Sequence, residues 1–325
     1  MKPFAHYNAR SIDEAVRLLK EYQGKAKLNA GGTDLLGLLK GRILPEYPKA
    51  IINIKTITGL DTIKEDKTGL KIGALARLAD IVRSPAIKEK YPVLSEAARL
   101  VATPLIRNVG TIGGNLAQDV RCCYYRYPHQ IGGPIICLRK GGKTCNALTG
   151  DNRYHSLFGA AHGCMAVNPS DMGIALIALN ASIVTSQRTI DAQGFFTTGA
   201  TESTMLDANE LITEIKIPPV PEGARQHYRK FVMREPVDFA IVSVASVITL
   251  KEGVCADARI VLGAVAPAPV RARKAEEIIK GRPIEEASAD EAAQSTLKAA
   301  KPLSMNAYKV EIARTLIKRA ILALS

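Results

Sequence analysis

Five of the chain's six cysteines lie in one segment, from Cys122 to Cys164, directly after a glycine-rich turn that begins at Gly110. This segment has little hydrophobic periodicity and no long apolar run. A loop of this length without secondary structure is usually functional or disordered, and its cysteines and aromatic residues argue against disorder. Because soft thiolates follow a turn suited to an anion, the pattern predicts two neighbouring cofactors and electron transfer.

The length and composition indicate a globular chain with two or three domains. The chain has 325 residues, of which 47% are apolar, enough for substantial cores. No apolar run reaches the roughly 18 residues of a membrane span, and the start lacks the apolar stretch of a signal peptide. We therefore expect a cytoplasmic protein, in which clustered cysteines favour metal or redox chemistry over disulfides.

The charge is strongly basic, but its pattern does not indicate nucleic-acid binding. Lysines and arginines exceed acidic residues by 44 − 31 = 13. They are scattered, with no Lys/Arg block and no nucleic-acid motif. A phosphate-bearing cofactor and an acidic partner surface are the favoured uses of this charge, and we expect no nucleic-acid partner and no membrane span.

Hydrophobic periodicity and turn residues predict alternating helices and strands outside the cysteine segment. Ser11 and Glu14 suit a helix start of the capping-box type. Residues 218–223, rich in proline, form the best linker candidate. The predicted helices span 11–22, 35–40 (a helix start), 80–84, 92–101, 172–178, 272–280 and 310–324, and the predicted strands span 26–30, 50–54, 70–74, 181–186, 240–250 and 258–265.

Two glycine turns have the composition of anion-binding loops. One is Gly31-Gly32-Thr33-Asp34 after a strand, and the other is Thr111-Ile112-Gly113-Gly114-Asn115. Adjacent glycines allow positive φ and let backbone N–H groups converge on an anion. Neither turn matches the Rossmann fingerprint, and neither has the lysine of a P-loop. Each could be an ordinary turn, but together the two could hold one diphosphate from both sides.

Two further positions could contact a nucleotide cofactor. Asp171 precedes an apolar helix and could accept a ribose hydroxyl, although a helix cap also explains Ser170-Asp171. Lys230 and Arg234 would share one face of a strand, where cations could stabilise a reduced flavin or its phosphates. A solvated strand face explains the same pair of cations.

The cysteine spacing leaves several ligand sets open. The intervals are 15 residues from Cys122 (or 14 from Cys123) to Cys137, then 8 to Cys145 and 19 to Cys164. Zinc sites and ferredoxin motifs use closer pairs, and reduced structural cysteines remain an alternative. A cluster with four ligand positions would use four of the five cysteines and leave either Cys122 or Cys123 unused. The sixth cysteine, Cys255, suits a small core residue, and the histidines of the segment, His129, His155 and His162, are left unassigned.

At these motifs the sequence resembles the FAD-binding medium subunits of molybdenum hydroxylases, such as xanthine dehydrogenase and carbon monoxide dehydrogenase. The resemblance covers nearly the whole chain, including Leu262-Gly263-Ala264-Val265-Ala266-Pro267 near its end. It implies an α+β protein with a PCMH-type FAD-binding fold of two α/β lobes, residues 1–57 and 58–220. An iron–sulfur insertion would occupy about 120–165. Residues 225–325 would form a β-sheet flanked by helices, of the CO dehydrogenase flavoprotein C-terminal type.

The resemblance also implies which residues would bind FAD. They gather in the two glycine turns, in the segments beside them and at the two polar positions described above. The residues are Asn29, Ala30, Gly31, Gly32, Thr33, Asp34, Leu35, Thr103, Gly110, Thr111, Gly113, Gly114, Asn115, Gln118, Asp119, Asp171 and Lys230.

The cysteine segment resembles the insertion in the β subunit of 4-hydroxybenzoyl-CoA reductase, which carries an extra [4Fe–4S] cluster. Arg121-Cys122, Cys137 and Gly141-Gly142-Lys143-Thr144-Cys145 match it. The match implies Cys122 over Cys123, and Cys164 is the remaining candidate for the fourth ligand. Here the sequence departs from the reductase, because Asn152-Arg153-Tyr154-His155 has no cysteine where the reductase has its last one.

The resemblance implies a subunit that transfers electrons without binding the organic substrate. Its partners would be a large molybdenum-cofactor subunit and a small [2Fe–2S] subunit, with ferredoxin as a possible external carrier. Two other functions fit parts of the sequence. They are a stand-alone FAD oxidase of the vanillyl-alcohol-oxidase fold and a zinc-stapled basic scaffold.

Overall fold

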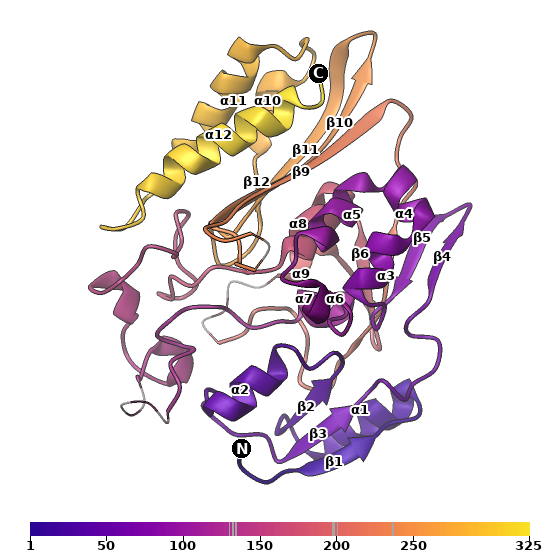
Figure 1. The fold of residues 1–325 in the computed structure, drawn as a ribbon, viewed down its shortest axis with the longest axis vertical. Coiled ribbons are helices and arrows are strands. Elements are labelled where there is room, and N and C mark those ends of the chain that lie inside the picture. The colour runs from indigo at the N-terminus through magenta and orange to yellow at the C-terminus, as the bar shows by residue number, and fades with distance from the viewer. Residues whose placement is uncertain (130, 132, 134, 197–198, 200, 236) are drawn as a thin grey trace.

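The N-terminal lobe is a parallel sheet whose strand ends face the rest of the molecule (Figure 1). The computed structural model describes the whole chain except residues 130, 132, 134, 197–198, 200 and 236. Strands β1 (Ala5–Asn8), β3 (Ala50–Asn53) and β2 (Ala26–Asn29) lie in that order, with α1 (Ile12–Glu21) packed on them. Ligands of open parallel sheets bind beyond the carboxyl ends of strands, and the first glycine turn leaves β2 at that edge.

A five-stranded antiparallel sheet forms the middle lobe. Its order is β4 (Ile63–Asp66), β5 (Gly69–Gly73), β8 (Ile212–Ile217), β6 (Ser182–Thr185) and β7 (Thr189–Asp191). The apolar helix α8 (Asp171–Ala178) is buried along its whole length. Helix α2 (Leu35–Gly41) follows the first glycine turn and lies with the N-terminal lobe (Figure 1). The other helices of the middle lobe are α3 (Leu78–Arg83), α4 (Pro85–Lys90), α5 (Pro92–Arg99), α6 (Pro104–Arg107), α7 (Ile112–Leu116) and α9 (Ala192–Phe195).

The C-terminal part is an antiparallel sheet covered by helices on one face and by the middle lobe on the other (Figure 1). Along the central strand, Val244 and Ile248 face the helices, while Ala245 and Val247 join the core of the middle lobe. This alternation follows from the two-residue period of a strand. The elements are β9 (Ala224–Phe231), β10 (Val242–Lys251), β11 (Val254–Gly263), β12 (Val270–Arg271), α10 (Arg273–Ile279), α11 (Glu286–Leu297) and α12 (Tyr308–Leu322).

Every helix and strand expected from periodicity is present, with ends shifted by a few residues. One expectation about a strand face is wrong. Strand β9 ends at Phe231, so Arg234 does not share a strand face with Lys230. Arg234 lies in the following loop and pairs with Asp238 at 2.7 Å. The sequence also did not reveal α11, because alanines rather than large apolar side chains provide most of its buried face.

The cysteine segment lies beside the two lobes and the C-terminal part as a long irregular loop (Figure 1). Its described residues contain only two short 3-10 turns, as the missing periodicity predicted. Contacts with the C-terminal part hold the end of this loop, around residues 155–157. The N–H of Leu157 donates to the Val265 carbonyl at 2.8 Å, and Leu157 belongs to the C-terminal core. Lys309 of α12 donates to the carbonyls of His155 (2.9 Å) and Ala264 (2.7 Å).

Within the described ranges, no helix is both long and apolar enough to cross a bilayer.

Lys309 should make the stability depend on pH. Its side chain is fully buried, and burial lowers its pKa from 10.5 to about 7. Between these two values the unfolded chain binds more protons than the folded one, so the free energy of unfolding should rise with pH, by at most about 1.4 kcal/mol per pH unit. Lys309→Met should remove this rise, as measured by denaturant titrations across that range. The exposed Lys298, changed to Met, is the control and should keep it; equal slopes in both variants would contradict the assignment.

Candidate functional site

The two glycine turns lie directly against each other. A Cβ added to Gly31 would lie 2.3 Å from the Val109 carbonyl oxygen and 2.9 Å from the Cα of Gly110. Such distances do not occur between real Cβ atoms, so only glycine lets the N-terminal lobe approach the middle lobe here. Gly32 has φ +72°, a conformation that also favours glycine. The pairing predicted from the repeated glycine pattern is therefore a direct backbone contact.

A cleft of about 850 Å³ opens where the two turns meet. Segments from both lobes and from the start of the C-terminal part line it. Of the predicted cofactor residues, those lining it are Ala30, Gly31, Gly32, Thr33, Asp34, Leu35, Thr103, Gly110, Thr111, Gly114, Asn115, Gln118 and Asp119. The four outside the lining are Asn29, Gly113, Asp171 and Lys230.

The first turn has the free donors that an anionic group needs. Within the described part of the chain, no acceptor meets the backbone N–H groups of residues 31–35. Five consecutive unpaired N–H groups at a cleft suit a diphosphate, because buried or half-buried donors are otherwise paired. The first turn and the adjoining cleft therefore fit the phosphate part of FAD.

The second turn contributes shape more than donors. The N–H of Gly113 is already bonded to the Ala74 carbonyl (2.9 Å), and that of Gly114 to the Thr111 hydroxyl (3.1 Å). Gly113 faces the core, where an added Cβ would lie 2.9 Å from the Ala74 oxygen. Gly114 instead borders the cleft, opposite Ala30, whose Cβ lies 4.0 Å from the position of an added Cβ. Of the two adjacent glycines, only Gly114 keeps the cleft open.

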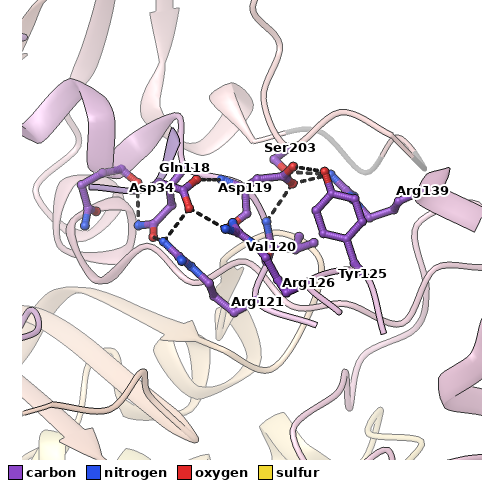
Figure 2. Close-up of polar contacts among 10 residues, drawn as sticks. Asp34, Gln118, Asp119, Val120, Arg121, Tyr125, Arg126, Arg139 and Ser203 are labelled. Carbon is purple, nitrogen blue, oxygen red and sulfur yellow. Dashed lines mark hydrogen bonds and ion pairs between the residues drawn. The ribbon is translucent and has the colours of Figure 1, made fainter. Parts of the chain in front are cut away.

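Asp34 joins the first turn to the start of the cysteine segment (Figure 2). Its Oδ1 lies 2.9 Å from a nitrogen of Arg121 and 2.8 Å from one of Arg126. Its Oδ2 accepts the N–H of Asp119 at 2.9 Å. Asp34 is thus used to hold the protein together at the cleft edge, beyond any contact it makes with a cofactor.

Asp119 extends this network into the cysteine segment (Figure 2). Its carboxylate pairs with Arg139 at 2.9 Å and accepts the Tyr125 hydroxyl at 2.6 Å. Burial, and then the Asp119 charge, raise the pKa of Tyr125 well above its usual value. Arg139 lies between Cys137 and Cys145 in sequence. The network therefore connects the first glycine turn, at the edge of the cleft, to the segment that carries the cysteines.

Asp171 and Lys230 form a buried ion pair behind the cleft. Their side chains are 5% and 3% exposed and lie 2.7 Å apart. Asp171 also accepts the Tyr228 hydroxyl at 2.6 Å, and Lys230 donates to the Leu100 carbonyl. Ser170 caps α8 and donates to the Asn115 side chain at 2.7 Å, which ties this pair to the second glycine turn.

The four predicted cluster ligands are divided between two small apolar clusters. Cys137, Cys164 and the half-buried Cys122 belong to or pack on one small apolar cluster, Cys145 belongs to a second, and Leu138 contacts both. Burial raises the pKa of Cys164. Burial lowers the pKa of Lys140, and the charges of Cys137 and Cys122 act in the opposite direction and raise it. The ammonium group of Lys140 thus lies within electrostatic range of two of these thiols.

The remaining cysteines differ in their surroundings. Cys123 is exposed, and the hydrogen bond between the adjacent thiols raises the pKa of Cys122 and lowers that of Cys123 to about 7. Cys255 lies in the C-terminal core. Among the described residues, no three Cys, His, Asp or Glu side chains are grouped closely enough to hold a metal ion. The described thiols therefore do not form an assembled metal site. As a residue type, cysteine thiolates are ligands of both zinc and iron–sulfur centres.

Sequence reasoning missed several residues of the cleft. Arg121 was noted only as a neighbour of Cys122, yet it lines the cleft and lies 4.5 Å from the ring of Phe239. Burial lowers the pKa of Arg121 to about 10. Ser203 and Val237 also line the cleft. Their segments carry no motif, so no local signal could have identified them.

Comparisons with known proteins agree with this architecture. Residues 2–220 match the model of the FAD binding domain in molybdopterin dehydrogenase, and residues 226–324 match that of the CO dehydrogenase flavoprotein C-terminal domain. The chain is 35% identical to the aldehyde oxidoreductase FAD-binding subunit PaoB of Escherichia coli strain K12, over 97% of this chain and 96% of that one.

A solved structure covers the whole fold. Carbon monoxide dehydrogenase from Hydrogenophaga pseudoflava, in a form that lacks the Mo-pyranopterin moiety, matches 100% of this chain and 98% of its own. The TM-score is 0.79 and the identity 29%. The medium chain of that enzyme is also 29% identical in sequence, over 98% of this chain and 96% of its own length.

A two-lobed cleft with a free-donor glycine turn, joined to a helix-covered sheet, defines a flavoprotein of the PCMH type. The chain belongs to the family of FAD-binding medium subunits of molybdenum hydroxylases. The predicted fold class is confirmed, with a PCMH-type FAD-binding domain followed by a CO dehydrogenase flavoprotein C-terminal domain.

Gly114→Leu should weaken FAD binding, because a side chain there would enter the cleft opposite Ala30. We expect a loss of at least about tenfold in affinity, roughly 1.4 kcal/mol, measured by flavin titration. Gly37→Leu is the matched control, since nothing lies within 4 Å of a Cβ at Gly37. Unchanged flavin affinity in a folded Gly114→Leu protein would show that the second turn does not border the cofactor.

Lys230→Met should destabilise the protein, because it leaves the buried Asp171 carboxylate without its counter-ion. The expected loss is about 3–5 kcal/mol in the free energy of unfolding, measured by denaturation of the flavin-free protein. The exposed Arg17–Glu21 pair provides the comparison, and Arg17→Met should cost less than about 1 kcal/mol. A similar small cost for both variants would contradict the structural role of the buried pair.

Proposed function

We propose that this chain is the FAD- and [4Fe–4S]-containing electron-transfer subunit of a molybdenum hydroxylase-type complex. The observation that carries the proposal is the position of the four-cysteine loop. Asp34 of the first glycine turn is ion-paired with Arg121 and Arg126, which flank Cys122 in sequence. One charged network thus joins the residues proposed to bind FAD to the residues proposed to bind the cluster.

The first glycine turn would hold the FAD diphosphate through the N–H groups of residues 31–35. Asn29 and Ala30 would support this turn. The second turn, from Gly110 to Asn115, would border the cofactor, with Thr103, Gln118 and Asp119 at the cleft wall. When bound, FAD would supply the exchange between two-electron and one-electron chemistry.

The ion pair of Asp171 and Lys230 would act on the sugar and the flavin from behind the cleft. Both side chains already have protein partners. We propose that Asp171 contacts the ribose and that Lys230 supplies the positive charge that favours a reduced, anionic flavin.

Cys122, Cys137, Cys145 and Cys164 would hold the [4Fe–4S] cluster. The packing of Leu138 against both cysteine-containing clusters and the exposure of Cys123 support this choice. The resemblance of the segment to the insertion of the 4-hydroxybenzoyl-CoA reductase β subunit supports the cluster type. Bound there, the cluster would supply one-electron transfer at a potential set by burial, charge and hydrogen bonds to sulfur.

The proposed partners are a large molybdenum-cofactor subunit and a small [2Fe–2S] subunit. The names of the relatives support them, because these proteins are medium chains or FAD-binding subunits of larger enzymes. The organic substrate would bind elsewhere in the complex. Ferredoxin is our proposed external carrier, since the net charge of +13 suits an acidic partner.

Cys145→Ser should abolish the iron–sulfur absorbance while FAD stays bound, because a hydroxyl is a poor substitute for a thiolate ligand. We expect iron and acid-labile sulfide to fall from about four per chain to near zero. Iron analysis and the flavin spectrum of the purified complex measure both cofactors.

Cys123→Ser is the control, since this exposed neighbour of Cys122 should be dispensable and iron should stay near the native level. Full iron content in Cys145→Ser would refute the ligand set. Zinc in place of iron in the native protein would favour the scaffold alternative. Absence of a flavin spectrum would contradict the whole proposal.

A further inference from the structure

We infer that His155 is a positioning residue for the cluster: its Nε2–H donates a hydrogen bond to the sulfur of Cys122 and raises the reduction potential of the cluster. This inference rests on the proposed [4Fe–4S] site. It adds to that site a residue that is not a ligand.

The contact between the two side chains is direct. His155 Nε2 lies 3.3 Å from Cys122 Sγ, within the range of hydrogen bonds to sulfur. His155 is buried, with only 4% of its surface exposed. Its other ring nitrogen, Nδ1, is buried and meets no partner within the described part of the chain. Among the described residues, Cys122 is therefore the one polar partner of this ring, whose buried N–H needs an acceptor.

The backbone of His155 is held from the far end of the chain. Its carbonyl accepts bonds from Lys309 Nζ at 2.9 Å and from the Asn306 side chain at 3.1 Å. Its N–H donates to the Asn152 carbonyl at 3.0 Å. The ring lies beside Tyr124, with 6.2 Å between centroids. These bonds hold the backbone of His155, and burial beside Tyr124 restricts the ring that faces Cys122.

The chemistry of the pair determines the direction of the effect. As a ligand, Cys122 would be a thiolate, an acceptor for the N–H of a neutral imidazole. One-electron reduction adds negative charge to a cluster and its sulfurs. A donated N–H stabilises that charge more in the reduced state than in the oxidised state, and the reduction potential rises. Loss of the donor should therefore lower the potential.

Two substitutions at one position separate this effect from packing. His155→Leu fills similar space without a donor. His155→Gln keeps an N–H near the position of Nε2. The experiment compares both with the native protein in the assembled complex, by iron and sulfide analysis and by redox titration followed by EPR of the reduced cluster and by the flavin absorbance.

We expect all three proteins to hold native iron and FAD. The cluster potential should be lower in His155→Leu and return toward the native value in His155→Gln, while the flavin potential stays unchanged. Loss of iron in His155→Leu with retention in His155→Gln would also support a role for the donated hydrogen bond.

Other results would overturn the inference. An unchanged cluster potential in iron-replete His155→Leu would remove the role of the hydrogen bond while leaving the cluster itself in place. Loss of iron from both variants, or equal shifts in both, would assign His155 a purely structural or ligating role. Absence of iron from the native complex would end both this inference and the proposed cluster.

Discussion

The ion pairs of Asp34 with Arg121 and Arg126 connect the parts on which the site depends. Asp34 leaves the N-terminal lobe with the first glycine turn, and both arginines belong to the start of the cysteine segment. Asp119 and Arg139 extend this network beside the cleft. Partial burial makes each pairing more effective than on an open surface.

The C-terminal part also shapes the cysteine segment, although it contributes none of the predicted cluster ligands. Lys309 and Asn306 bind the carbonyls around His155, and Leu157 enters the C-terminal core. A loop with almost no secondary structure would otherwise carry many unpaired backbone groups. The C-terminal residues pair some of these groups and hold the backbone of His155, whose ring contacts Cys122.

The two glycine turns show how far local pattern reading extends. Their composition predicted two loops at one cleft, and both loops line it. The pattern did not distinguish their roles. The first turn keeps its N–H groups free, whereas those of Gly113 and Gly114 are used within the protein. Similar sequences thus leave the backbone N–H groups free in the first turn and pair them within the protein in the second. The difference arises because some hydrogen-bond partners, such as the Ala74 carbonyl, lie outside the motif.

The sequence by itself determined the two glycine turns and the irregular, cysteine-rich loop, because each depends on local periodicity or on residue types with special backbone or ligand chemistry. The fold class followed from the resemblance of these motifs to a known family. The tertiary structure alone decided which distant groups meet. It paired Asp171 with Lys230, ended β9 before Arg234, brought Arg121 and Phe239 to the cleft, and set His155 against Cys122. These contacts join residues that are far apart in the chain, or whose spacing has no motif, and packing of the three sheets fixes them.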